Sequence, residues 1–92
     1  MRIDWSGPAF ADPQEISLHI ENDRGIATAN RVIREIYDAI QTLRRFPYRG
    51  RSGRIQDTRE LVIAGRPWLA IYRLDRDRVI VLNIVHGAQR FP

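Results

Sequence analysis

Cysteine is absent from this 92-residue chain, which excludes a disulfide framework and any metal site built on thiolates. The two histidines, His19 and His86, do not form a pair with ligand spacing, so we expect neither a structural zinc ion nor another cofactor. No apolar run approaches the roughly 20 residues of a membrane helix, and no secretion signal begins the chain. These absences predict a cytoplasmic protein without membrane contact.

Lysine is also absent, so all 15 basic residues are arginines, which outnumber the 11 acidic residues and give a net charge of +4. Guanidinium groups make planar, bidentate contacts with carboxylates and phosphates. The arginines are densest in residues 44–59, where they number six: Arg44, Arg45, Arg49, Arg51, Arg54 and Arg59. This basic patch fits a nucleic acid, an acidic protein segment or solubility alone, and composition does not decide among the three.

The second half of the chain predicts three consecutive antiparallel strands, at residues 61–64, 68–74 and 79–85. The links between them, A-G-R-P and D-R-D-R, have the length of hairpin turns. Alternate residues of the middle strand share a face, so Trp68, Ala70, Tyr72 and Leu74 lie opposite Leu69, Ile71 and Arg73. Both faces are partly apolar, so we expect both to be covered, one by helices and the other by a partner.

The first half predicts a short strand at residues 2–6, placed at the edge of the sheet with the chain ends close together, and then two helices. Asp12-Pro13-Gln14-Glu15 is typical of a helix start, although helix could begin at about residue 9 with Pro13 as a kink. This helix should end before the turn residues 22–25. The second helix should bury one stripe: Ile26, Ala29, Ile33, Ile36, Ile40 and Leu43.

These elements predict one α+β domain over residues 1–92, in the order β-α-α-β-β-β. A helical hairpin would pack on one face of a small, mainly antiparallel sheet.

Four motifs occur in order along the chain: L-x-x-F-P-x-x-G-R-x-G-R at 43–54, T-R-E-L-V-I at 58–63, I-Y-R-L at 71–74 and V-H-G-A-Q-R-F-P at 85–92. Together they resemble the RelE/ParE toxin superfamily of bacterial type II toxin–antitoxin modules, over nearly the whole chain. That resemblance implies the same β-α-α-β-β-β fold.

The resemblance implies one of two activities, since RelE-like members are ribosome-dependent mRNA endonucleases and ParE-like members inhibit DNA gyrase. Where RelE-like nucleases carry basic residues, this chain has Glu60, Val62 and Leu69. A metal-independent nuclease would therefore depend on His86 as general acid or base, with Arg73 and Arg90 holding the phosphate. The G-R-S-G-R loop, the T-R-E-L-V-I strand and the H-G-A-Q-R-F-P ending look more like ParE, which favours a growth-inhibiting gyrase poison that is not an enzyme.

The resemblance also implies partners, namely a cognate antitoxin in a hetero-oligomer and a target, which is DNA gyrase or, for the nuclease, the ribosome and mRNA. Six candidate target-binding residues follow: Arg49, Arg51, Arg54, Arg59, His86 and Arg90. An antitoxin of this superfamily lays an acidic segment on the helices and sheet, with Trp5, Phe10, Leu18 and Tyr37 as candidate anchors. A degenerate toxin that only binds its antitoxin is a third possibility.

Overall fold

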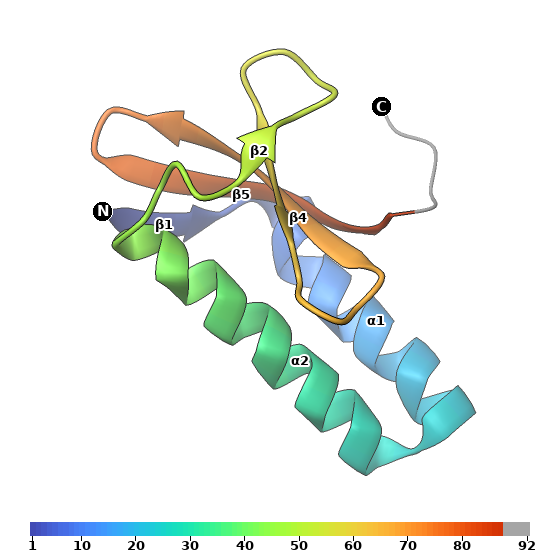
Figure 1. The fold of residues 1–92 in the computed structure, drawn as a ribbon. Coiled ribbons are helices and arrows are strands. Elements are labelled where there is room, and N and C mark those ends of the chain that lie inside the picture. Colours follow the sequence, from blue (N-terminus) through green and yellow to red (C-terminus); the bar gives the residue numbers. More distant parts are fainter. Residues whose placement is uncertain (88–92) are drawn as a thin grey trace.

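The computed structural model describes residues 1–87 as a five-stranded sheet with two helices on one face (Figure 1). Its elements run along the chain as β1 (Arg2–Trp5), α1 (Gly7–Arg24), α2 (Ile26–Gln41), the 3-10 turn η1 (Thr42–Arg44), β2 (Arg51–Ser52), β3 (Arg59–Val62), β4 (Trp68–Asp75) and β5 (Arg78–His86). The predicted α+β class, helical hairpin and mainly antiparallel sheet are confirmed. The two-residue strand β2 is an addition to the predicted order.

The strands lie in the order β1-β5-β4-β3-β2. β4 and β5 form the central hairpin, whose turn holds Arg76 at a φ of 60°. β1 is an edge strand, as predicted, but it pairs with β5 in parallel, with Arg2 beside Arg78. The start of the chain therefore lies at the start of β5, whereas β5 ends at His86 opposite Trp68. The expectation that the chain ends lie near each other falls on the last five residues, which lie outside the described ones.

Helix α1 begins earlier than the D-P-Q-E pattern indicates. Ser6 is its N-cap, because the Ser6 hydroxyl accepts the backbone N–H of Ala9 at 3.1 Å and donates to the carbonyl of Leu82 at 2.8 Å. Asp12 is used differently, since its carboxylate accepts the backbone N–H of Ile84 in β5 at 2.8 Å. Pro13 is buried inside the helix, so the earlier of the two predicted starts is nearer to the observed one.

The buried stripe of α2 is rotated from the predicted one. Ala29, Ile36, Ile40 and Leu43 are buried as predicted, but Ile26 is 62% exposed and Val32 is buried instead. Ile26 opens α2 just after Gly25, where the helical hairpin turns back at a distance from the sheet (Figure 1). An apolar residue there has no sheet to pack against, so periodicity alone misplaced it.

The core lies between the helices and the sheet. Ala70 and Tyr72 of β4 join Val79 and Val81 of β5 in it, facing the α2 stripe. Leu69, Ile71 and Ile80 are at most 9% exposed but belong to the face of the sheet that turns away from the helices, here called the outer face. The helices cover one face, as predicted, whereas these three residues of the outer face are buried within the chain itself, so a partner on that face stays a prediction. Within residues 1–87, neither helix is both long and apolar enough to cross a membrane.

Candidate functional surfaces

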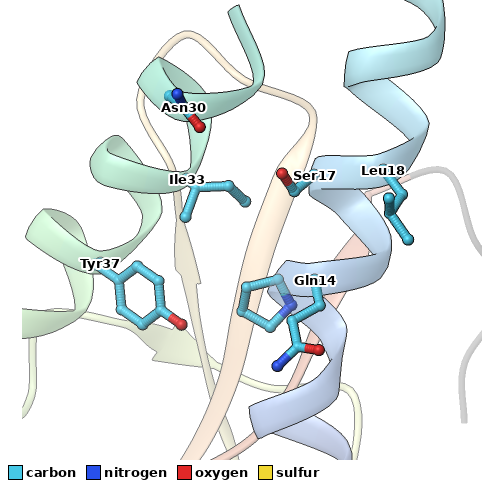
Figure 2. Close-up of a pocket in the computed structure, with 7 residues that line it drawn as sticks. Gln14, Ser17, Leu18, Asn30, Ile33 and Tyr37 are labelled. Atoms are coloured by element: carbon cyan, nitrogen blue, oxygen red, sulfur yellow. The ribbon is translucent and has the colours of Figure 1, made fainter. Parts of the chain in front are cut away.

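A groove runs between the two helices on the side away from the sheet. Its volume is about 420 Å³, and we call it the hairpin groove after its lining residues: Pro13, Gln14, Ser17, Leu18, Asn30, Ile33 and Tyr37. Figure 2 shows Ile33 and Tyr37 of α2 facing Gln14 and Ser17 of α1. Leu18 is 61% exposed and Tyr37 is 39% exposed, so apolar surface here is accessible to a partner.

The structure brings together some of the four predicted antitoxin anchors. Leu18 and Tyr37 line the hairpin groove. Trp5 is half-buried against the core and packs on Tyr37, with ring centroids 5.2 Å apart and planes tilted by 45°. Phe10 is exposed on α1 but does not line the groove. Sequence reasoning missed the groove residue Ile33, because its spacing fits the core stripe of α2 equally well.

A buried carboxylate organises the arginine-rich loop beside β2 and β3, at the edge of the sheet opposite β1. Glu60 of β3 is 2% exposed, and one of its oxygens is 3.2 Å from Nη2 of Arg51. Its second oxygen accepts the backbone N–H of Arg54 at 2.9 Å and lies 3.9 Å from that residue's Nε. Two of the candidate target-binding arginines therefore already neutralise an internal charge. The sequence offered no signal for this role of Glu60.

Arg59 binds the turn that contains Tyr48 and Gly50. Its Nη1 donates to the carbonyl of Gly50 at 2.7 Å and to that of Tyr48 at 3.3 Å, and its guanidinium lies 5.0 Å from the centre of the Tyr48 ring. The buried hydroxyl of Tyr72 accepts the N–H of Gly50 at 2.9 Å and donates to the carbonyl of Pro47 at 2.8 Å. Burial raises the pKa of Tyr72, so the hydroxyl stays protonated. The segment 47–50 that follows α2 is thus held by hydrogen bonds from both Tyr72 and Arg59.

His86 lies beside the first residue of β4, whereas Arg59 lies beside the middle of that strand, at Tyr72. His86 is paired with Trp68, and the two rings meet edge to face at 5.2 Å. Both line a cleft on the helix side of the sheet together with His19 and Arg66. Arg66 also donates to Glu35 of α2 at 2.7 Å, and this hydrogen bond lowers the pKa of Glu35.

The structure describes two of the three candidate nuclease residues, Arg73 and His86, and it does not bring these two together. Arg73 is exposed on the outer face, whereas His86 points to the helix side. Arg90 lies outside the described residues. The positions at which RelE-like nucleases carry basic residues are occupied on the outer face by Glu60, Val62 and Leu69. Within residues 1–87, no group of three or more metal-ligating side chains is assembled.

Two helices on one face of a mixed sheet, with β1 parallel to β5, are the architecture of the RelE/ParE toxin superfamily. The family described as "ParE toxin of type II toxin-antitoxin system, parDE" matches residues 3–91. This chain belongs to that family of toxins.

The chain is 42% identical over 91 residues to a protein of Sinorhizobium fredii (strain NBRC 101917 / NGR234) named "Putative toxin Y4kP", covering 99% of this chain and 93% of that protein. Among solved structures, the chromosomal ParDE system from P. aeruginosa superimposes with a TM-score of 0.87 at 23% identity, covering 94% of this chain and 95% of the other. A copper-bound mutant toxin from Helicobacter pylori gives a TM-score of 0.67 at 16% identity, covering 99% of both chains. At these identities the two structures establish the fold alone.

Proposed function

We propose that this toxin inhibits growth by poisoning DNA gyrase and that a cognate antitoxin neutralises it. The observation that carries the first half is the outer face of the sheet. Cleavage of RNA through its 2′-hydroxyl needs a base and positive charge around the phosphate. At the positions where RelE-like nucleases carry basic residues, the outer face of this chain carries the buried acid Glu60, the apolar Val62 and the buried Leu69. Such a surface favours a toxin that binds its target over one that cleaves RNA.

A pulse of expression in a bacterial host tests this proposal. We expect filamentation and a DNA-damage response while ribosome-bound mRNA stays intact. Supercoiling by purified gyrase, with added toxin, gives the same test outside the cell and should show accumulated cleaved DNA. Cuts in mRNA in register with codons would instead establish the RelE-like endonuclease, and an absence of any growth effect would leave only antitoxin binding.

Two separate surfaces are candidates for the gyrase contact. One is the arginine-rich loop and its flanking strands, with Arg49, Arg51, Arg54 and Arg59, and the other includes His86 at the end of β5 and Arg90, which lies outside the described residues. Because His86 pairs with the first residue of β4 and Arg59 with its middle, paired variants distinguish the two groups. Arg49→Gln with Arg51→Gln alters the first, and His86→Gln with Arg90→Gln alters the second. Full toxicity of a folded variant would eliminate the surface that it alters.

The hairpin groove is our proposed antitoxin site. Its exposed Leu18 and Tyr37 would receive apolar side chains of a segment that folds on binding. The net charge of +4 would attract an acidic segment. The groove joins two helices that the core already holds in place, so the toxin needs no rearrangement to bind.

Leu18→Arg tests this site, with Ile26→Arg as the matched control. Both side chains are exposed, at 61% and 62%, but only Leu18 lines the groove. We expect the Leu18→Arg toxin to remain toxic when the antitoxin is co-expressed, whereas the Ile26→Arg toxin should still be rescued. Equal rescue of both variants would place the antitoxin elsewhere.

A further inference from the structure

Two aromatic side chains stand exposed in the turn that follows α2. Phe46 is 58% exposed and Tyr48 is 69% exposed, with Pro47 between them. Residues 45–49 line a shallow, mainly apolar hollow of their own, and we call them the aromatic turn. The turn lies at the end of α2 beside the start of the chain, where the amino terminus donates to the carbonyl of Arg44 at 2.8 Å (Figure 1). It is far along the helix from the hairpin turn at Gly25.

Hydrogen bonds within the chain hold the backbone of the aromatic turn. The backbone N–H of Phe46 donates to Thr42 at 2.9 Å, and that of Arg49 donates to Phe46 at 3.1 Å. Tyr72 and Arg59 hold the carbonyls of Pro47 and Tyr48 from the sheet side. The rings are therefore presented by a backbone that is already ordered, which lowers the entropy cost of binding.

The charge around the rings is positive, and no acidic side chain among residues 1–87 pairs with the two arginines of the aromatic turn. Arg45 and Arg49 are exposed, and neither side chain makes an ion pair or hydrogen bond within the part of the chain that the structure describes. The sequence contains no acidic residue between Asp38 and Asp57. The nearby carboxylate of Glu60 is engaged with Arg51 and Arg54. Arg59 covers one side of the Tyr48 ring, so the exposed area of that ring is its remaining face and edge.

We propose that the aromatic turn binds single-stranded nucleic acid, with bases stacked on Phe46 and Tyr48 and phosphates held by Arg45 and Arg49. Two exposed flat rings, with a guanidinium group on each side of them in the chain, fit a ligand that offers both unstacked bases and phosphates. Bases inside a duplex offer no free face for stacking. An acidic peptide would satisfy the arginines but would leave the two rings in water. This inference does not depend on which target the toxin has.

The test is fluorescence anisotropy of the purified full-length toxin with a labelled oligo-dT of about twelve nucleotides. Tyr48→Leu and Phe46→Leu keep the residues apolar and remove the ring faces. We expect each substitution to weaken binding by about 5- to 150-fold, which corresponds to the loss of stacking on one base. Phe10→Leu is the matched control, because Phe10 is equally exposed, at 65%, but lies on α1 away from the turn; its affinity should not change.

Charge is tested separately. Arg49→Gln should lower the slope of log affinity against log salt by about 0.7, the value for one phosphate contact to a single strand. Thermal unfolding of every variant should match that of the wild type, since all the altered side chains are exposed.

Three outcomes would overturn the proposal. They are an equal loss of affinity in Phe10→Leu, binding of a duplex as tight as that of the single strand, and displacement of the oligonucleotide by poly-glutamate at lower charge concentration than by unlabelled oligo-dT. The last would identify an acidic protein as the ligand. Failure of the anisotropy test would leave the gyrase proposal intact, because that proposal is tested by DNA damage in cells. Equally, an absence of DNA damage in cells would not change the affinity measured for oligo-dT.

Discussion

At the scale of single residues, the contact between Gly50 and Tyr72 holds the arginine-rich end of the molecule together. Tyr72 is fully buried, and its hydroxyl is the partner of both the Gly50 N–H and the Pro47 carbonyl. A Cβ atom at Gly50 would lie 2.6 Å from the Tyr72 ring and hydroxyl. Glycine is therefore required here by close approach of a side chain, rather than by backbone conformation.

Tyr72→Phe should lower the free energy of unfolding by about 1–3 kcal/mol, because it leaves two buried backbone groups without a partner. Urea denaturation would measure this difference. Because burial raises the pKa of Tyr72, the stabilisation by its hydroxyl is fully present below the ordinary pKa of 10.0 and is lost as the pH rises through the raised value. A difference between wild type and variant that stays constant well above pH 10 would contradict this assignment.

Gly50→Ala should destabilise the protein by about 1–3 kcal/mol, since the new methyl group must displace the buried Tyr72 ring. Gly7→Ala is its control: nothing lies within 4 Å of a Cβ at Gly7, which begins α1, so this variant should be as stable as the wild type or slightly more so. Equal midpoints of urea denaturation for the two variants would show that the Tyr72 contact is softer than its geometry indicates.

At the scale of secondary structure elements, an ionic cluster fastens β1 to the start of β5. Arg78 lies 3.1 Å from Asp4 of β1 and 3.1 Å from Asp75 of β4, and Arg2 is 3.2 Å from Asp4. The hydrogen bond from Arg78 lowers the pKa of Asp4, and the Arg78 contact does the same for Asp75. β1 is four residues long, so side-chain contacts add to a short ladder of backbone hydrogen bonds.

Asp4→Asn should lower the midpoint of thermal unfolding near neutral pH. Since the pKa of Asp4 is lowered in the folded protein, its contribution is present above the ordinary value of 3.8 and is lost as the pH falls through the lowered one. The gap between wild type and variant should therefore close in strong acid. Asp23→Asn is the control, because the Asp23–Arg24 pair is longer, at 3.8 Å, and more than two-thirds exposed, and should leave the midpoint unchanged at every pH.

At the scale of the whole molecule, three surfaces face different directions. The hairpin groove lies between the helices, the arginine-rich turn and loop lie by the β2–β3 edge of the sheet, and His86 lies at the end of β5. This separation means that an antitoxin seated in the groove need not touch the arginines. It also means that a substitution at one surface should leave the other two surfaces unaltered, so its effect on function can be assigned to that surface.

The net charge of +4 acts over all three surfaces and should govern the rate of antitoxin binding. We expect the association rate with an acidic antitoxin to fall several-fold as salt is raised from low to physiological concentration, because steering by charge is screened. If the antitoxin binds in the hairpin groove as proposed, the dissociation rate should change little, because apolar contacts would then hold the complex. Stopped-flow or surface-binding kinetics would measure both, and an association rate independent of salt would contradict the role of charge.

The strands and helices could be predicted from the sequence because each is specified by neighbouring residues. Alternation marks β4 and β5, the Gly25 and Pro47 breaks bound α2, and D-R-D-R marks the hairpin turn. The resemblance of four motifs to the RelE/ParE superfamily is confirmed by the family match over residues 3–91. The antitoxin anchors and target-binding residues remain predictions.

Only the tertiary structure decided which residues meet across the chain. Asp12 and Ser6 bind backbone groups of β5 more than 70 residues away, which local helix-start patterns do not reveal. Burial of Val32 in place of Ile26 depends on where the helical hairpin extends past the sheet. The contacts of Glu60 with Arg51 and Arg54 depend on how the loop after β2 folds back. Periodicity and turn chemistry act between near neighbours, so they determine elements. Packing, buried charge and the separation of His86 from Arg73 arise only when distant elements come together.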